Sequence, residues 1–454
     1  MRRTLRTGRA AVVFAAIGAL ALTGCGGGKD GGEPGDAGPT NGGESPSSVR
    51  LPELNGEKVE VAAVWSGPEQ ENFTKVLDEF EKRTGATVTF VPAQDPIVNF
   101  LGTKIAGGSP PDVAMLPQVG AIRQSVARKW AKPVGPEAKE QLERNYSKGW
   151  QELGAVDGTQ YGVYYKAANK SLIWYNNAVF ENAGATEPKT WDEFLSAADT
   201  ISASGVTPVS VAGADGWVLT DWFENVYLSQ AGPEKYDRLA KHEIKWTDPS
   251  VKDALTTLGE LFGKPNLIAG GTDGALQTEF PTSVTQTFTG GDAPKSAMVF
   301  EGDFVTVNIA QTDAEIGKDA KVFPFPAVGA EPPVVTGGDA AVALKNTRGA
   351  QALLTFLASP DAAAIQAGAG GFLSPNKSLD VAAYPNDVQR DIAKALIAAG
   401  DDVRFDMSDQ MPQSFGGTPG KGEWKILQDF LKNPKDVAGT QQKLEAEAAK
   451  AFKS

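Results

Sequence analysis

The chain of 454 residues is poor in two side chains on which much enzyme and metal chemistry depends, with one cysteine and one histidine. A single cysteine excludes a disulfide within the chain, so the fold must be stabilised by its own core. Too few histidines and cysteines are present for zinc sites built from these residues, and almost none are available for Ser-His or Cys-His catalysis. The histidine, His242, lies in a polar stretch (AKHE), where we expect a solvated side chain.

Basic residues are fewer than acidic residues. The chain has 43 lysines and arginines, 56 aspartates and glutamates, and a formal net charge of −13. Removal of residues 1–24 would take four arginines with it, which makes the net charge four units more negative, −17. This balance argues against nucleic acid and anionic lipid as binding partners.

The N-terminus lacks an apolar run long enough to span a membrane. Four arginines precede residues 10–22, which are 13 residues without charge. A helix of that length measures about 20 Å, whereas a hydrocarbon core is about 30 Å thick. The basic start, the short apolar stretch and the small residues after it are typical of a secretory signal. We therefore predict a signal peptide over residues 1–24, rather than a permanent transmembrane helix.

Residues 22–25 (LTGC) resemble the lipobox of bacterial lipoproteins, whose cysteine is acylated and becomes the mature N-terminus. The resemblance predicts a lipid anchor on Cys25, at the outer face of the cell membrane. The alternative is an ordinary signal peptide with an incidental cysteine. Residues 26–50 contain nine glycines and no aromatic residue, and such a segment cannot build a core. We expect residues 25–55 to form the lipidated cysteine and a flexible tether.

From residue 57 the chain alternates strand and helix patterns, which indicates an α/β body. Residues 58–65 (KVEVAAVW) and 86–92 (ATVTFVP) are predicted strands, and residues 70–84 between them are a predicted amphipathic helix that ends at Gly85. A β-α-β order implies parallel pairing of the two strands. Thr190 and Glu193 have the spacing of a capping box at the start of a second helix. Further helices are expected at 250–262, 348–358, 386–398, 422–432 and 440–452.

The order of short motifs along this body resembles the extracellular solute-binding proteins of ABC sugar importers, the maltose-binding-protein-like class. The motifs lie at residues 80–85 (FEKRTG), 111–113 (PDV), 174–176 (WYN), 188–194 (PKTWDEF), 297–302 (AMVFEG) and 323–326 (FPFP). Three longer segments resemble the α-glucoside branch of that class, at residues 170–175, 216–224 and 404–412. The resemblance implies an α-linked glucoside ligand such as maltose, trehalose, sucrose or a short oligosaccharide.

The same resemblance implies the architecture and the partners. The fold would be the two-lobed periplasmic-binding-protein type (class II), with a ligand cleft between lobes joined by a hinge that the chain crosses more than once. The N-lobe would comprise residues 56–165 and 333–380, and the C-lobe residues 166–332 and 381–454. A monomer would deliver sugar to permease subunits in the membrane, with no catalytic residue, metal or other cofactor.

A sugar presents two apolar C–H faces and a rim of hydroxyls, so its site needs aromatic rings together with carboxylates or amides. The segment 213–224 holds several such residues, and if it is helical Trp217 and Asp221 share one face. One tryptophan of this segment is expected in the core. Residues 337–339 (GGD) are predicted to form a turn, and residues 406–409 form a polar cluster in which we favour sugar contact over calcium, because the glycine and distal glutamate of an EF-hand are missing. The expected substrate-binding residues are Trp65, Glu69, Gln118, Asn169, Trp217, Asp221, Trp222, Glu224, Asp303, Phe304, Asp339, Asp406, Asp409 and Trp424.

Some of these expectations depend on the resemblance alone. It implies that the loop carrying Trp65 and Glu69 lines the cleft, that Asn169 lies near it, and that Phe304 stands where the family often has a stacking tryptophan. Two other function classes stay open at this stage. A glycoside hydrolase uses a pair of carboxylates, and 56 acids always offer such a pair. The second is an importer receptor for a polyamine or another non-sugar solute, and a polyamine would also suit an acidic cleft lined by aromatic residues.

Overall fold

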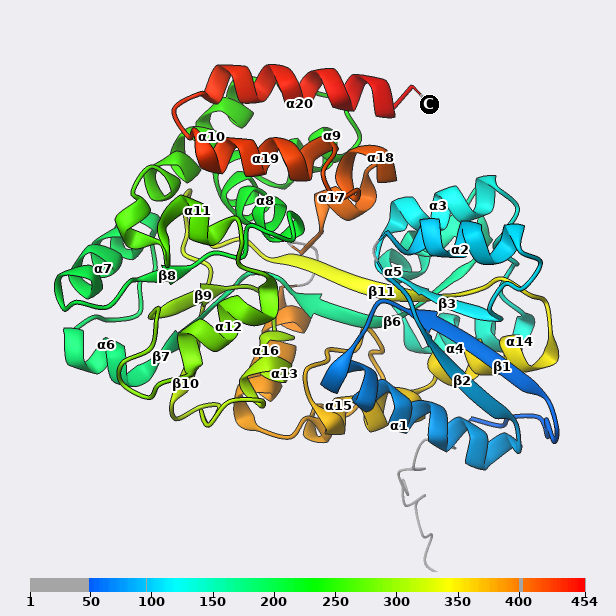
Figure 1. Ribbon diagram of the computed structural model, residues 1–454. Helices are drawn as coiled ribbons and strands as arrows, with labels where there is room; N and C mark the ends of the chain where they lie inside the picture. The colour runs from blue at the N-terminus through cyan, green and yellow to red at the C-terminus, as the bar shows by residue number, and fades with distance from the viewer. Residues whose placement is uncertain (1–48, 95, 400–402, 454) are drawn as a thin grey trace, which may run out of the picture. The chain divides into compact units, whose positions relative to one another are not determined.

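The computed structural model describes residues 49–94, 96–399 and 403–453, and its secondary structure is organised around two separate β-sheets flanked by helices (Figure 1). The predicted signal peptide, Cys25 and the tether up to residue 48 lie outside the described residues. Within the described residues, no helix combines the length and the apolar character that crossing a membrane requires. The chain has the expected two-lobed α/β fold, with one sheet in each lobe.

The first sheet has six strands in the order β12-β11-β3-β1-β2, with β6 also paired to β11. Strands β1, β2 and β3 run parallel, whereas β11 runs antiparallel to β3 and β6. The strands are β1 (Lys58–Ala63), β2 (Thr87–Pro92), β3 (Val113–Leu116), β6 (Gly162–Asn169), β11 (Val335–Ala343) and β12 (Arg404–Phe405).

The second sheet has four strands in the order β10-β7-β9-β8, in which β8 and β9 are parallel and the other pairs are antiparallel. They are β7 (Leu172–Asn176), β8 (Val209–Ser210), β9 (Met298–Phe300) and β10 (Ala320–Pro324). A short hairpin of β4 (Ala155–Val156) and β5 (Thr159–Gln160) lies apart from both sheets.

Helices cover both sheets. Up to β8 these are α1 (Gly67–Thr84), α2 (Ile97–Ala106), α3 (Val119–Ala127), α4 (Pro136–Asn145), α5 (Lys148–Leu153), α6 (Asn177–Ala183) and α7 (Trp191–Ala203). Between β8 and β11 they are α8 (Trp217–Ala231), α9 (Pro233–Ala240), α10 (Pro249–Phe262), α11 (Gly271–Ala275), α12 (Phe280–Phe288) and α13 (Val305–Ile309). After β11 they are α14 (Arg348–Leu357), α15 (Pro360–Ala369), α16 (Asp387–Ala398), α17 (Met407–Gln410), α18 (Gln413–Gly416), α19 (Gly422–Lys432) and α20 (Val437–Ala451). Two 3-10 turns occur at Pro265–Leu267 and Val381–Ala383.

The opening β-α-β unit forms as its sequence predicts. Helix α1 buries Phe73, Val76, Leu77 and Phe80, which recur on one helical face. It ends at Gly85, whose φ of 73° is left-handed and lets its N–H bond the carbonyl of Glu81. Strands β1 and β2 pair in parallel on either side of this helix in sequence, as expected.

The capping box at α7 is confirmed. The Thr190 hydroxyl accepts a hydrogen bond from the Glu193 N–H, and the Glu193 carboxylate accepts one from the Thr190 N–H. Both are backbone donors that a helix start would otherwise leave without partners. The later helices α10, α14, α16, α19 and α20 also form within about three residues of their predicted bounds.

The chain crosses between the two sheets at two adjoining places. One is the β6–β7 link at residues 170–171, and the other is the segment between β10 and β11. The Lys170 N–H donates to the Val335 carbonyl (2.8 Å), the Val335 N–H to the Ser171 hydroxyl (2.8 Å) and the Phe325 N–H to the Ser171 carbonyl (2.8 Å). These crossings, which Figure 1 shows as β6 and β11 running through the middle of the molecule, form the hinge region.

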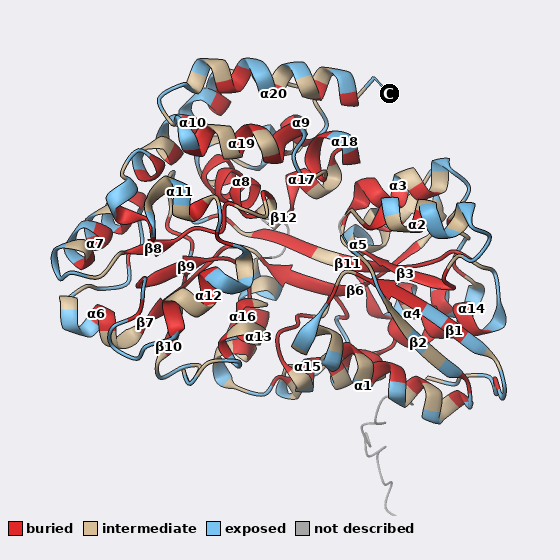
Figure 2. Cartoon of the chain, viewed as in Figure 1, coloured by how far each residue is buried: buried red, intermediate tan, exposed pale blue. Residues whose placement is uncertain are grey.

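Most strands of both sheets are buried, whereas the edge strand β2 has only intermediate and exposed residues and the edge strand β10 is partly buried (Figure 2). One apolar cluster packs around the second sheet and α8, and two pack around the first sheet. One of those two also includes Trp174 of β7 and Val299 of β9, so apolar contacts continue from one lobe into the other. The lobe boundaries expected from the sequence stay a prediction.

Three local expectations differ from the structure. Residues 337–339, expected as a turn, lie inside β11, where the pairing with β6 shifts register after Asp339. His242, expected in solvent, is half-buried, with its ring against Phe452 and Nε2 at 3.1 Å from the Glu445 carboxylate. Residues 49–55, expected in the tether, contact the body: Leu54 is buried, and the Val49 N–H donates to Asp361.

Candidate ligand-binding site

A cavity of about 230 Å³ lies at the hinge, where the ends of the first sheet face helix α8 and the segment around α17. Its wall combines aromatic rings, acids and two lysines from distant parts of the chain. The lining residues are Val64, Trp65, Glu69, Pro117, Gln118, Lys166, Ala168, Lys170, Trp217, Phe280, Phe304, Gly338, Asp339, Asp406, Ser408, Asp409 and Trp424.

Five aromatic residues line this cavity. Trp217, Phe280 and Phe304 form a contiguous group, with ring centroids 5.4 to 6.1 Å apart in tilted and edge-on contacts. Trp65 follows β1, and Trp424 belongs to the first turn of α19. Rings brought together from both lobes provide apolar faces of the kind that stack on a sugar ring.

Lys166 on β6 ties two of the lining acids together. Its ammonium pairs with Glu69, which lies in the first turn of α1, and lies 3.9 Å from Asp339 on β11. Burial alone would lower the pKa of Lys166, but the negative charges of Glu69 and Asp339 outweigh it and raise that pKa. Lys166 therefore stays protonated, and it orients Glu69 and Asp339 along one side of the cavity.

Lys170 has the same role for a second pair of acids. Its ammonium lies 3.0 Å from Asp221 on α8, pairs with Asp406 and lies 5.4 Å from the centre of the Trp217 ring. Burial acts to raise the pKa of Asp406, but Lys170 and hydrogen bonds hold it at about 2. Burial raises the pKa of Asp221 well above its usual value, against the opposing charge of Lys170.

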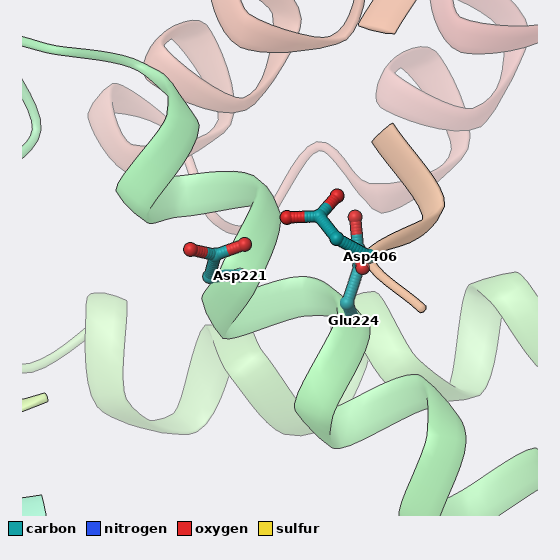
Figure 3. Close-up of side chains that lie close together, drawn as sticks. All are labelled: Asp221, Glu224 and Asp406. Carbon is teal, nitrogen blue, oxygen red and sulfur yellow. The ribbon is translucent and has the colours of Figure 1, made fainter. Parts of the chain in front are cut away.

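Glu224 anchors the segment that carries Asp406. Figure 3 shows Asp221 and Glu224 on α8 with Asp406 facing them from the neighbouring segment. The Glu224 carboxylate accepts hydrogen bonds from the Met407 N–H (2.6 Å), the Ser408 N–H (2.8 Å) and the Tyr236 hydroxyl (2.5 Å). It is fully buried, so its role is to fix the backbone around α17.

The three carboxylates in Figure 3 have oxygen atoms within 4.8 Å of one another, a spacing that a metal ion could use. Their oxygens are engaged, however. Asp221 and Asp406 face the Lys170 ammonium, and Glu224 accepts the three hydrogen bonds described above. An ammonium supplies the positive charge that the cluster needs, so these residues do not fit a metal site.

The structure brings nine of the fourteen expected residues to the cavity wall: Trp65, Glu69, Gln118, Trp217, Phe304, Asp339, Asp406, Asp409 and Trp424. Gln118 reaches the wall because it stands at the N-terminal end of α3, two residues after β3, and its side chain makes no capping hydrogen bond. Contact of these residues with a ligand stays a prediction.

Five expected residues lie behind the wall. Trp222 is fully buried among Trp191, Phe300 and Phe325, because one helical face of α8 packs on the second sheet. Asp221 and Glu224 are fully buried and satisfy Lys170 and the backbone near α17.

The remaining two of the five, Asp303 and Asn169, hold the hinge backbone. The Asp303 carboxylate accepts a hydrogen bond from the Asn169 N–H (2.7 Å), and the Asn169 side chain accepts one from the Ser171 N–H (3.0 Å). Sequence reasoning missed Lys166, Lys170 and Phe280, and it included Ser408 only as a member of the polar cluster at 406–409. The position of Lys170 in the segment 170–175, which resembles the α-glucoside branch, was a usable signal, but its acidic partners are 51 and 236 residues away.

Comparison with known proteins agrees with this arrangement. The profile of the family described as bacterial extracellular solute-binding protein matches residues 65–364. The chain belongs to this family. It is thus the solute-binding component of an ABC transporter for sugars or related solutes, and a receptor rather than an enzyme.

Two relatives of this receptor align over nearly their full length. The osmoprotective compounds-binding protein GgtB of Synechocystis sp. is 33% identical over 398 residues, which cover 85% of this chain and 92% of that protein. The alpha-glucosides-binding periplasmic protein AglE of Rhizobium meliloti is 31% identical over 408 residues, which cover 86% and 87%.

Solved structures show the same fold at lower sequence identity. The solute receptor AcbH, with its preference for β-D-galactopyranose, superimposes with a TM-score of 0.76 at 20% identity, covering 87% of this chain and 99% of its own. Maltose-bound MalE3 of T. maritima gives a TM-score of 0.68 at 17% identity, covering 86% and 99%. These similarities support the two-lobed fold and leave the ligand of this receptor open.

Proposed function

We propose that the receptor captures an α-linked glucoside outside the cell and delivers it to the permease subunits of an ABC importer. The observation that carries this proposal is the cavity wall, in which five aromatic rings surround acids that two lysines hold in place. Sugar C–H faces stack on such rings, and sugar hydroxyls donate to carboxylates in hydrogen bonds of about 1.5–3 kcal/mol.

The ligand classes named for the two full-length relatives narrow the choice. One relative is named for alpha-glucosides and the other for osmoprotective compounds. Trehalose and sucrose are α-glucosides that also act as osmoprotectants, so they meet both descriptions. Maltose and short α-linked oligosaccharides meet the first.

We further propose that the receptor acts as a monomer held at the outer face of the membrane by lipid on Cys25. A stable anchor needs two acyl chains, because one chain binds a membrane only marginally. A glycine-rich segment of about 25 residues has a typical end-to-end distance of roughly 25–30 Å. This reach is enough to hold the folded body clear of the lipid headgroups and near a permease.

The test is a melting-temperature screen followed by calorimetric titration. A ligand present at 100 times its dissociation constant stabilises the folded state by about 2.7 kcal/mol. We expect trehalose, sucrose or maltose to raise the melting temperature, and spermidine and putrescine to leave it unchanged. A shift with the polyamines alone would overturn the proposal, and sustained glucose release from the sugars would contradict a receptor function.

A further inference from the structure

The charged residues of the cavity wall are unevenly paired. Four carboxylates and two ammonium groups line it. Lys166 pairs with Glu69 and lies 3.9 Å from Asp339, while Lys170 pairs with Asp406 and, behind the wall, with Asp221. Each lysine therefore has two acids within ion-pair distance, and carboxyl groups outnumber ammonium groups in the lining.

Asp409 is the lining acid that neither lysine contacts in an ion pair, although the charge of Lys170 acts on it from a longer distance. Its backbone N–H donates to Asp406 (3.0 Å), which places its side chain on the first turn of α17. Among the described residues, none donates a hydrogen bond to its carboxylate or forms an ion pair with it. Asp406 accepts, by contrast, from Lys170, the Ser408 hydroxyl and the Asp409 N–H.

A partly buried carboxylate without a donor is costly unless a ligand completes it. Burial, followed by the charge of Asp406, raises the pKa of Asp409 well above its usual value, and the charge of Lys170 opposes this rise without cancelling it. A positive group beside Asp409 would favour its ionised form, as Lys170 does for Asp406. A hydroxyl would supply one donor, whereas an ammonium would supply up to three donors and a charge.

We propose, resting on the proposed function, that Asp409 acts as a charge filter, meaning that it makes the cavity select ligands by their charge. The receptor then binds neutral α-glucosides and α-glucosides carrying an ammonium group, and it discriminates against those carrying a phosphate or carboxylate. The aromatic wall suits the same ligands. Indole and phenyl faces attract cations, and the Lys166 ammonium already lies 5.7 Å from the centre of Trp65 and 5.6 Å from that of Phe304. An anion, in contrast, would meet the excess carboxylates.

The experiment measures dissociation constants by calorimetry for trehalose, 2-amino-2-deoxytrehalose, 6-amino-6-deoxytrehalose and trehalose 6-phosphate. The proteins are the wild type, Asp409→Asn and Asp313→Asn, in which the control removes an exposed acid outside the cavity. Comparing ligand ratios between proteins cancels the steric effect of each added group. If sucrose or maltose binds better than trehalose, its amino and phosphate derivatives take the place of those of trehalose.

We expect the wild type to bind at least one amino derivative more than tenfold tighter than the phosphate. In Asp409→Asn that preference should shrink by about tenfold, because two charges a few ångströms apart interact strongly in a partly buried site. Asp313→Asn should match the wild type. Asp409→Ser serves the same comparison if the asparagine variant loses binding.

Three outcomes would overturn the inference. One is a wild type that prefers the phosphate, and another is a preference that Asp409→Asn and Asp409→Ser leave unchanged. The third is absence of binding for every neutral α-glucoside, which also overturns the proposed function. Binding of the neutral sugars with an unchanged preference rejects the charge filter alone.

Discussion

Replacing Lys170 by methionine tests whether its ammonium balances the acids at the hinge. The lysine side chain is 11% exposed, and its partners Asp221 and Asp406 are 0% and 1% exposed. Methionine keeps much of the aliphatic volume but leaves two buried carboxylates without a counter-charge. Breaking a buried pair in this way costs about 3–5 kcal/mol.

The chain contains a matched control at the surface. Lys264 and Asp199 form an ion pair of similar length, 3.2 Å, with side chains 42% and 58% exposed. Because solvent screens that pair, Lys264→Met should cost less than about 1 kcal/mol. Burial, rather than distance, then accounts for the expected difference between the two variants.

The pH dependence follows from the same charges. In wild type, Asp406 has its pKa held at about 2, so its stabilising effect is complete above the unfolded value near 3.9 and constant between pH 5 and 8. Without Lys170, burial raises the folded pKa of Asp406 above its unfolded value, and it raises the pKa of Asp221, which is already high in the wild type, still further. The resulting loss of stability grows as pH rises above about 4 and shrinks as pH falls.

The assay is urea unfolding followed by circular dichroism at pH 8 and pH 5. We expect Lys170→Met to lose about 3–5 kcal/mol at pH 8 and less at pH 5, and the double variant Lys170→Met/Asp221→Asn to regain part of the loss. A deficit no larger than that of Lys264→Met, or one that stays constant between the two pH values, would refute the reasoning.

Three further predictions concern the cavity, the contact between α3 and α17, and the anchor. Trp217→Ala should weaken sugar binding with little loss of stability. Trp222→Ala, which empties a core position, should lower the free energy of unfolding in urea by about 3–5 kcal/mol. The reverse pattern would mean that Trp222 contacts the ligand and Trp217 belongs to the core. A Cβ on Gly120 would lie 2.3 Å from the Met411 carbonyl oxygen. Gly120→Ala should therefore destabilise the protein by about 1–3 kcal/mol and weaken its affinity for sugar. An unchanged binding titration together with an unchanged melting curve would contradict this prediction. Cys25→Ser should move the protein from the detergent phase to the aqueous phase of a Triton X-114 partition, and retention in the detergent phase would exclude a lipid on that residue.

Local signals in the sequence were enough to predict much of the fold. The capping box of Thr190 and the apolar face of α1 depend on residues within one or two helical turns, and both formed as expected. The GGD segment at 337–339 was predicted wrongly because its place in β11 depends on pairing with β6, some 170 residues earlier in the chain.

The candidate site could be predicted only in part for the same reason. Helix α8 is buried almost all round, from Val218 to Leu228, so its sequence does not show which face reaches the cavity. Trp217 at its start lines the wall, and Trp222 one and a half turns later lies in the core. The pairing of Lys170 with Asp406 joins residues 236 positions apart, a contact that no local pattern encodes.

The place of Lys170 has a mechanical consequence. Its backbone is bonded to Val335 at the point where the two crossing segments adjoin, and its side chain lines the cavity. A ligand held there would touch the pivot itself, at the short end of a lever whose long arms are the two lobes. A small displacement of the sugar would then become a larger movement at the outer rims of the lobes.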